Sequence, residues 1–336
     1  MTPSANHPLD VLLVSGEYPP DPGGVGDYTR LLAREMIARG HHCGLLTGGP
    51  RAAHPSLPGE PPIIAVARDW SWRSLDPIIA AIREHNPGIV HIQYQTGAYG
   101  MRPAINFLPA RLRRLDSRPR VVVTAHDLRL PYLLPKAGAL RRWVTRRLFE
   151  DADAVIVTNA EDQLRLAGQG PPDRDHFLAR RGIAAHVIPI GSNIMPAPPD
   201  GFQRDRWRAV NGVREGEVVA AFFGLPTPTK GLRELVQAIA RLPANLRLHI
   251  AGGEPQQPRE QEYTAHVRAA IAELKLEHRV SWSGYLDPPA VSAHLLASDI
   301  GVLPFLDGAS YRRGSLLAML AHRLPVVTTR PPAPLI

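Results

Sequence analysis

The chain has 336 residues, of which 44% are hydrophobic and 21% charged, so it can bury a sizeable core, and its length favours two domains over one. No run approaches about 18 apolar residues, and MTPSANHPLD at the N-terminus lacks the basic and apolar regions of a secretory signal, which together predict a cytoplasmic protein. The net charge of +8 comes almost wholly from arginine, with Lys136, Lys230 and Lys275 as the only lysines.

The first predicted strand, Val11–Ser15, leads through a Pro/Gly-rich loop into a helix over Gly26–Arg39. Such a turn places backbone N–H groups and a helix N-terminus at the carboxyl end of a parallel sheet, where anions bind, so we expect Gly23 and Gly24 to approach a phosphate. A plain structural loop is the alternative. The dinucleotide fingerprint fits poorly because the loop is too long and HHCGLLTGG, which contains the second strand, offers no acidic residue for a ribose.

Strands and helices alternate through the first 190 residues, which predicts a parallel sheet covered on both faces. The other strand-like runs are Cys43–Thr47, Ile63–Val66, Ile89–Ile92, Val121–Thr124, Ala154–Thr158 and His186–Ile188. The other helical patterns are Ser74–His85, Ala104–Leu115, Leu140–Glu150 and Glu161–Ala167.

Cys43 is the only cysteine, which excludes a disulfide within the chain, and we interpret the trio of His41, His42 and Cys43 as the start of a strand rather than a metal site.

The region Arg102–Arg147 is strongly basic, with twelve Lys or Arg against Asp116 and Asp127, a local excess of +10. One interpretation is a peripheral contact with an anionic membrane or attraction of a phosphorylated acceptor. The other is the solvated face of two helices. The absence of interleaved aromatic residues and of a recognition motif argues against nucleic acid as a partner.

The alternating pattern lapses over residues 191–217, which are rich in Pro, Asn, Gly and charge and predict an interdomain linker with at most one short helix. It resumes over residues 218–336. The strands expected there are Val218–Phe223, Arg247–Ala251, Val280–Ser283, Ile300–Leu303 and Val326–Thr329, and the helices are Gly231–Arg241, Glu260–Leu274, Ala290–Ala297 and Ser315–Ala321. The predicted fold is therefore α/β, with two Rossmann-like domains facing each other across a cleft. No closing helices follow the last strand, so we expect an incomplete C-terminal domain.

Seven segments match, in order, landmarks of one large enzyme family. They are EYPPDPGGVGDYTRLLAREMIARGH, VTAHD, VIPIGSNI, FFGLPTPTKGLRELVQAIA, LHIAGGEP, SGYLDPPAVSAHLLASDIGVLPF and LAHRLPVVTT. The chain thus resembles the group-1 retaining glycosyltransferases of the GT-B fold over nearly its whole length. This resemblance implies that the domain over residues 218–336 holds a nucleotide-diphosphate sugar and that the domain over residues 1–190 holds the acceptor.

The chemistry of glycosyl transfer points to particular residues in these motifs. A nucleoside diphosphate leaves, so cations and N–H groups must stabilise negative charge, and Lys230 lies at the predicted junction of a loop and a helix. His126 ends a buried strand, where the resemblance implies contact with the donor sugar or the reaction centre; a structural pair in which Asp127 caps a helix is the alternative. Glu17, Asp27 and Asp127 are candidates for holding acceptor hydroxyls.

The sequence also departs from the family pattern. The family carries two glutamates in the donor site, and the equivalent positions here are Ser310 and Ala318, while Leu225 stands at the place of a family arginine. Further donor-site candidates follow Ser310: Arg312, Arg313, Gly314 and Ser315. Our hypothesis is that Arg312 or Arg313 replaces the missing cation on the diphosphate, with Gly314 and Ser315 offering N–H groups at a helix start.

The predicted function is transfer of a sugar from a nucleotide-diphosphate donor to a carbohydrate or lipid-linked acceptor, with retention of configuration. We expect neither a cofactor nor a metal. The alternative is a catalytically inactive regulatory protein that binds a nucleotide sugar on the same scaffold. An epimerase of this fold would need acids that the chain lacks, and a pyridoxal-phosphate phosphorylase would need a lysine after Lys275, where there is none.

Overall fold

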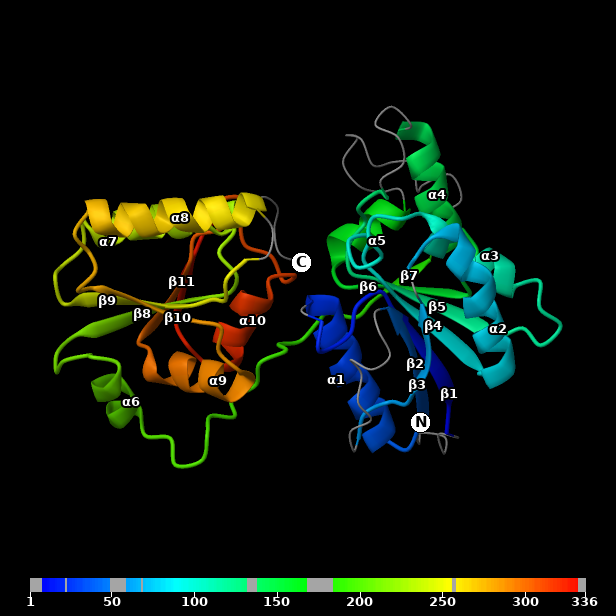
Figure 1. The fold of residues 1–336 in the computed structure, drawn as a ribbon, viewed down its shortest axis with the longest axis horizontal. Helices are drawn as coiled ribbons and strands as arrows, with labels where there is room; N and C mark the ends of the chain where they lie inside the picture. Colours follow the sequence, from blue (N-terminus) through cyan, green and yellow to red (C-terminus); the bar gives the residue numbers. More distant parts are fainter. Residues whose placement is uncertain are drawn as a thin grey trace. The chain divides into compact units, whose positions relative to one another are not determined.

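Two parallel β-sheets, each flanked by helices, make up the computed structural model, and the chain divides after Pro189 into two units (Figure 1). The structure describes residues 8–21, 23–48, 59–67, 69–131, 138–167, 184–255 and 258–331.

The first unit contains a seven-stranded sheet in the order β3-β2-β1-β4-β5-β6-β7, with every pairing parallel. Its strands are β1 (Asp10–Ser15), β2 (His42–Gly48), β3 (Ile63–Ala67), β4 (Ile89–Tyr94), β5 (Arg120–Ala125), β6 (Ala154–Val157) and β7 (Ala185–Val187). Its α-helices are α1 (Gly24–Ala38), α2 (Leu75–His85), α3 (Leu108–Leu112), α4 (Gly138–Glu150) and α5 (Ala160–Ala167), and the short 3-10 helices η2 (Trp72–Ser74) and η3 (Ala104–Phe107) precede α2 and α3.

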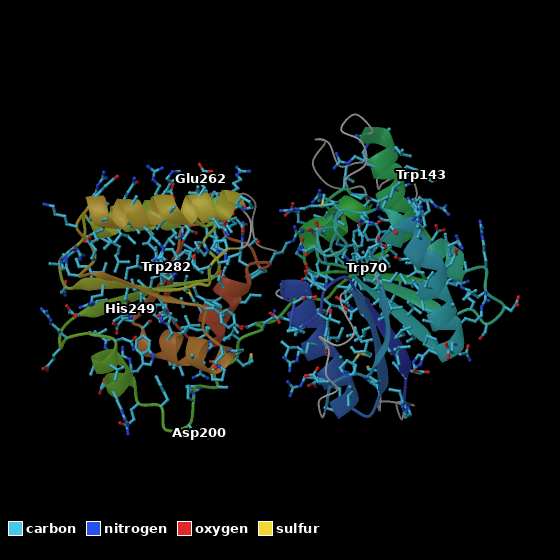
Figure 2. The ribbon with its side chains drawn as sticks, viewed as in Figure 1. Trp70, Trp143, Asp200, His249, Glu262 and Trp282 are labelled. Carbon is cyan, nitrogen blue, oxygen red and sulfur yellow. The ribbon has the colours of Figure 1, made fainter. Side chains whose placement is uncertain are left out.

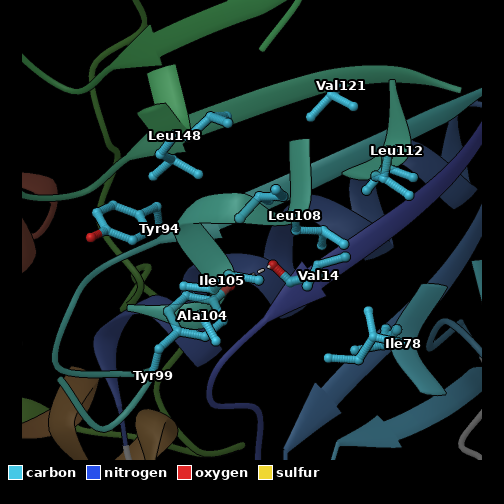
Figure 3. Close-up of a cluster of buried hydrophobic side chains, with 14 of the residues drawn as sticks. Val14, Ile78, Tyr94, Tyr99, Ala104, Ile105, Leu108, Leu112, Val121 and Leu148 are labelled. Atoms are coloured by element: carbon cyan, nitrogen blue, oxygen red, sulfur yellow. Dashed lines mark hydrogen bonds between the residues drawn. The ribbon is translucent and has the colours of Figure 1, made fainter. Parts of the chain in front are cut away.

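The side chains of β1 alternate between two hydrophobic clusters, because successive residues of a strand point to opposite faces of the sheet. Val11 and Leu13 pack with α1 on one face. Leu12 and Val14 belong to the larger cluster on the other face, which receives side chains from α2, α3 and α4 (Figure 3). The predicted two-faced parallel sheet is confirmed.

The helix expected over Ala104–Leu115 is instead two pieces, η3 and α3. Pro109 lies in the first turn of α3. Proline lacks an N–H and its ring clashes with the carbonyl four residues earlier, so a single helix cannot run through this position. The prediction of one continuous helix was wrong for this reason.

The second unit contains a five-stranded parallel sheet in the order β10-β9-β8-β11-β12. Its strands are β8 (Val218–Phe223), β9 (Leu246–Ala251), β10 (Val280–Gly284), β11 (Ile300–Leu303) and β12 (Val326–Thr328). Its helices are α6 (Arg204–Val210), the 3-10 helix η5 (Pro228–Lys230), α7 (Leu232–Ile239), α8 (Pro258–Glu273), α9 (Pro288–Ala297) and α10 (Gly314–Ala321). Helices α7 and α8 cover one face of the sheet, and α9 and α10 cover the other (Figure 1).

The segment over residues 191–217, which the sequence suggested as a linker, belongs to the second unit. Its helix α6 packs against α9. Arg208 of α6 bonds Asp299 at 2.9 Å and the Ala297 carbonyl at 3.1 Å, which fixes α6 to the end of α9.

The basic region Arg102–Arg147 carries less net charge than its sequence indicates. Among the described residues, seven of its arginines form ion pairs: Arg102 with Asp69, Arg111 with Asp76, Arg113 and Arg147 with Asp151, Arg118 with Asp153, Arg129 with Asp127, and Arg146 with Glu150. Five of these six carboxylates lie outside the region in sequence, so a count over Arg102–Arg147 leaves them out. The local excess of +10 therefore overstates the charge that this surface presents.

Candidate functional site

The donor-site candidates of the second unit gather at the carboxyl ends of β8 and β11. These two strands are neighbours, and the strand order reverses between them, which is where open α/β sheets bind ligands. Lys230 lies in η5, after β8, and Ser315 lies in the first turn of α10, after β11. Gly224 follows β8 directly, and a Cβ placed there would overlap the Lys230 ammonium and approach Ser315 Cβ to 3.7 Å. The structure thus brings Gly224, Lys230 and Ser315 together.

Lys230 is a partly buried cation. No hydrogen bond or ion pair joins its ammonium to the rest of the described chain. Burial and, as the second cause, the nearby charge of Arg313 lower its pKa to about 8, and Glu260 acts in the opposite direction. The ammonium is still mainly protonated at neutral pH. A desolvated charge of this kind gains strongly from an anionic partner, so the position suits a phosphate group.

Arg313 is already engaged within the unit. Its guanidinium pairs with Asp307 and lies 4.7 Å from the ring centre of Phe305. The backbone N–H of Arg312 donates to Ser310 Oγ at 3.3 Å. Gly314 begins α10 with open space at its Cβ position. Arg313 is one of two charged neighbours of Lys230, with Glu260, and its pairing with Asp307 compensates part of its charge.

The two positions where the family carries glutamates differ in environment. Ser310 lies in the loop before α10, whereas Ala318 is fully buried among the core side chains of the second unit. Leu225, at the place of the family arginine, is exposed. Of the two positions where the family pattern has carboxylates, one thus carries a hydroxyl group, Ser310, and the other a buried methyl group, Ala318.

In the first unit, Glu17 caps the helix that the sequence suggested as a phosphate site. Its Oε1 accepts hydrogen bonds from the backbone N–H groups of Val25 at 3.0 Å and Gly26 at 3.2 Å. Burial raises the pKa of this carboxyl, and the two N–H groups partly offset that effect. A Cβ on Gly23 would overlap the same carboxylate, whereas Gly24 faces open space. Glu17, which the sequence suggested as an acceptor contact, thus occupies two of the first N–H groups of α1. The second acid predicted to contact the acceptor, Asp27, lies exposed in the first turn of the same helix.

His126 follows β5 and lies close to α1. Its Nε2 is 3.0 Å from Gln93 Oε1, and its ring makes an edge contact with Tyr28 at 4.8 Å between centres. Burial lowers its pKa to about 4, with His91 as the second cause, so the imidazole is neutral at pH 7. It can exchange a hydrogen bond with a ligand but supplies no positive charge.

Asp127 caps a turn rather than a helix. Its Oδ1 accepts from the backbone N–H of Arg129 at 3.2 Å, and no helix begins there in the described residues. The alternative in which Asp127 acts as a helix cap is therefore wrong in its detail.

A pocket of about 360 Å³ in the first unit was missed by the sequence reasoning. Its wall includes Asp21, Asp69, Trp70, Tyr99 and Arg102. Asp69 and Arg102 are 33 positions apart and meet only because β3 and β4 end at the same edge of the sheet. The one local signal was Asp69 followed by two serines, a pattern typical of a side-chain-capped turn.

An exposed aromatic strip runs over the surface of the first unit, formed by Trp72, Phe107 and Trp143 (Trp143 is labelled in Figure 2). The ring centres are 5.0 Å apart between Trp72 and Phe107 and 5.6 Å apart between Phe107 and Trp143. The exposed fractions of Trp72 and Trp143 are 54% and 43%, and Leu140, one helical turn before Trp143, is 50% exposed. Contiguous exposed apolar surface of this kind indicates an interaction site.

Other features are structural. Cys43 is buried among Val11 and Leu13, and burial raises its thiol pKa to about 11. None of the helices in the described part of the chain combines the length and apolar character needed to cross a membrane.

The fold and the strand-end sites define an α/β protein of two parallel-sheet units, with a partly buried ammonium, Lys230, at the strand-order reversal of the second sheet. Residues 23–182 match the family described as Glycosyl transferase 4-like domain, and residues 217–335 match Glycosyl transferases group 1. The chain belongs to the group-1 glycosyltransferase family and has the GT-B fold.

Sequence relatives and solved structures agree with this assignment. The chain is 28% identical over 279 residues to alpha-maltose-1-phosphate synthase of Mycolicibacterium smegmatis; the match covers 79% of this chain and 65% of that protein, so the chain spans less than two thirds of the relative's length. Sucrose-phosphate synthase from Thermosynechococcus elongatus has a similar structure, with a TM-score of 0.69 and 20% identity over 96% of this chain and 81% of that one. Anabaena HepE, solved with UDP and glucose, gives a TM-score of 0.66 at 18% identity, covering 95% and 80%.

Proposed function

We propose that this protein is a glycosyltransferase that moves a sugar from a nucleotide-diphosphate donor to a carbohydrate or lipid-linked acceptor, with retention of configuration. The observation that carries the proposal is Lys230, a partly buried ammonium without an ion-pair partner in the described chain, at the strand-order reversal of the second sheet. The solved complexes of HepE with UDP and the family of the chain support the same kind of donor.

In the proposed reaction the bond between the sugar C1 and the diphosphate oxygen breaks, and a bond from C1 to the acceptor oxygen forms on the same face. The acceptor proton passes to the leaving phosphate oxygen, so no side-chain base is required. Lys230 would stabilise the charge that develops on the leaving diphosphate, and Gly314 and Ser315 would offer N–H groups. We assign Gly23, Gly24, Arg312 and Arg313 to supporting donor contacts, and His126 to a hydrogen bond near the reacting sugar.

The acceptor assignments of Glu17, Asp27 and Asp127 stay predictions. The capping role of Glu17 leaves Asp27 as the more accessible of the two acids near α1. The names of two relatives, alpha-maltose-1-phosphate synthase and sucrose-phosphate synthase, describe phosphorylated disaccharide products. A sugar or sugar phosphate is therefore a natural first acceptor to test.

We also propose a peripheral membrane contact of the first unit, made by the aromatic strip and the arginines beside it rather than by the whole basic region. Arg73 follows Trp72 and Arg142 precedes Trp143, and both arginines are exposed. Tryptophan prefers the boundary between water and lipid, and arginine is attracted to anionic headgroups.

The donor proposal is tested by binding of UDP-, GDP-, ADP- and dTDP-sugars to the full chain, followed by release of the nucleoside diphosphate with candidate acceptors. A ligand at 100 times its dissociation constant should stabilise the protein by about 2.7 kcal/mol in thermal unfolding. Lys230→Ala should lose this stabilisation, whereas Lys275→Ala, at an exposed lysine after α8, should keep it.

The outcomes separate the candidates. Binding that depends on Lys230, with nucleotide release, supports the transferase. Binding without release in the presence of every acceptor supports the inactive regulatory protein. Equal binding by the Lys230→Ala variant would contradict the assigned donor site.

A further inference from the structure

The pocket of the first unit lies at the carboxyl ends of four neighbouring strands. Gly16 follows β1, Gly48 ends β2, Ala67 ends β3, and Gly97 lies in the loop after β4. The strand order reverses between β1 and β4, so the pocket occupies the position at which parallel sheets bind ligands. Its volume, about 360 Å³, falls in the range of small-molecule sites.

The inner wall of the pocket is rigid. A Cβ on Gly16 would overlap the Ala98 carbonyl, so the loops after β1 and β4 touch backbone to backbone. Trp70 packs edge-on against Tyr99 at 4.7 Å, and the Tyr99 hydroxyl donates to the carbonyl oxygen of Val14 at 3.1 Å (Figure 3). A wall fixed in this way needs little rearrangement when a ligand binds.

Asp69 and Arg102 form a fixed polar pair in the pocket wall. Asp69 Oδ1 accepts from Ser71 N–H at 3.1 Å and from the hydroxyls of Ser71 and Ser74 at 2.6 Å each. Its Oδ2 accepts from Arg102 at 3.2 Å. These bonds hold the pKa of Asp69 well below its usual range, so it is ionised. The guanidinium of Arg102 has five N–H donors and is about half exposed, so it keeps donors for a ligand.

The charges of the pocket wall favour a neutral ligand. Asp21 and Asp69 are carboxylates and Arg102 is the one cation among the described residues that line the pocket, which gives a net charge of −1. A phosphate dianion would face two carboxylates. Sugar hydroxyls, by contrast, can donate to Asp21 and accept from Arg102 without bringing charge.

We propose that this pocket binds an uncharged sugar ring of the acceptor, with Arg102 as a binding residue and Asp69 as the residue that positions it. That this sugar ring belongs to the acceptor of a transfer reaction rests on the transferase function proposed above. The choice of an uncharged ring differs from what the names of the two relatives would suggest, and so the sugar and its phosphate must be compared directly.

The experiment measures dissociation constants of the full chain by calorimetry for glucose, galactose, mannose, N-acetylglucosamine and maltose, and for glucose 1-phosphate and glucose 6-phosphate. We expect at least one neutral sugar to bind saturably. The dissociation constants of both glucose phosphates should be at least tenfold higher than that of this neutral sugar. Arg102→Gln and Asp69→Asn should each weaken the neutral sugar about tenfold. The matched control is Arg111→Gln, which removes a similarly exposed arginine that pairs with Asp76 outside the pocket.

Three results would overturn the proposal: no saturable binding of any neutral sugar, tighter binding of a glucose phosphate than of every neutral sugar, or unchanged affinity in both pocket variants. The thermal midpoint of each variant shows whether it is folded. Nucleotide binding at Lys230 is measured on the same preparations, so loss of the donor site and loss of this pocket are told apart.

Discussion

The ammonium of Lys230 should give nucleotide binding a measurable dependence on pH. Its pKa of about 8 means that it loses its proton as the pH rises from 7 to 9, and a neutral amine holds a diphosphate less well. We expect the dissociation constant of a bound nucleotide to rise about tenfold between pH 7 and pH 9. Lys230→Arg keeps its charge throughout this range and should remove the dependence, so equal profiles for the two proteins would contradict the role of the ammonium.

Single residues were predicted from sequence where the chemistry is local. Lys230 and Ser315 could be placed at strand ends because each directly follows a recognisable strand or begins a helix. Arg102 and Asp69 could not be paired, because their contact depends on the order of strands in the sheet. The acceptor contact of Glu17 stays a prediction. Its hydrogen bonds to the N–H groups of Val25 and Gly26 could not be foreseen, because a carboxylate eight or nine residues before a helix N–H gives no sequence signal.

Helix α6 lies over two buried histidines, His249 and His294, which we expect to make the second unit sensitive to acid. Trp207 of α6 contacts His249 of β9 at 5.7 Å and His294 of α9 at 5.5 Å, ring centre to centre (His249 is labelled in Figure 2). The Nε2 of His249 lacks a hydrogen-bond partner in the described chain. Burial lowers the pKa values of His249 and His294 to about 4 and about 3; Arg247, Arg208 and Glu217 are the charged neighbours of His249.

Each imidazole is favoured as the neutral form in the folded state, so the unfolded state binds more protons below about pH 6.5 and stability is lost as the pH falls. We expect the free energy of unfolding to drop by about 2 kcal/mol per imidazole between pH 7 and pH 5. His294→Leu should remove its share of that drop in urea titrations at the two pH values. The control is His278→Leu at an exposed histidine, which should show the same loss of unfolding free energy between pH 7 and pH 5 as the parent chain. If His294→Leu also shows the full loss, burial of His294 does not cause it.

At the level of elements, the strands and most helices agree with the sequence to within about two residues, because hydrophobic periodicity and turn residues are local signals. The sequence analysis did not predict the break between η3 and α3, although Pro109 in the first turn of α3 is a local signal for it. The attachment of α6 was beyond prediction, since it depends on Arg208 reaching Asp299 more than ninety positions away. Element boundaries follow from the local sequence, and packing partners do not.

For the whole molecule, the proposed membrane contact predicts binding to vesicles that depends on the aromatic strip. The protein should co-sediment with vesicles containing phosphatidylglycerol and less with pure phosphatidylcholine, because Arg73 and Arg142 add electrostatic attraction. The double variant Trp72→Ala/Trp143→Ala should bind at least fivefold more weakly. Tyr285→Ala, which removes an aromatic ring that is 82% exposed in the second unit, is the control. Failure to bind either vesicle, or equal binding by the double variant, would exclude this surface.

The cap on α1 also bears on which ligands the whole protein can accept. Glu17 is joined to the helix by a short loop, so its carboxylate competes for the N–H groups of Val25 and Gly26 as a tethered ligand, at an effective concentration of about millimolar or above. Free phosphate or sulfate must compete with this tethered carboxylate, so we expect it to bind the N-terminus of α1 more weakly than an uncapped helix end. A ligand that gains affinity from further contacts elsewhere is better able to displace the carboxylate.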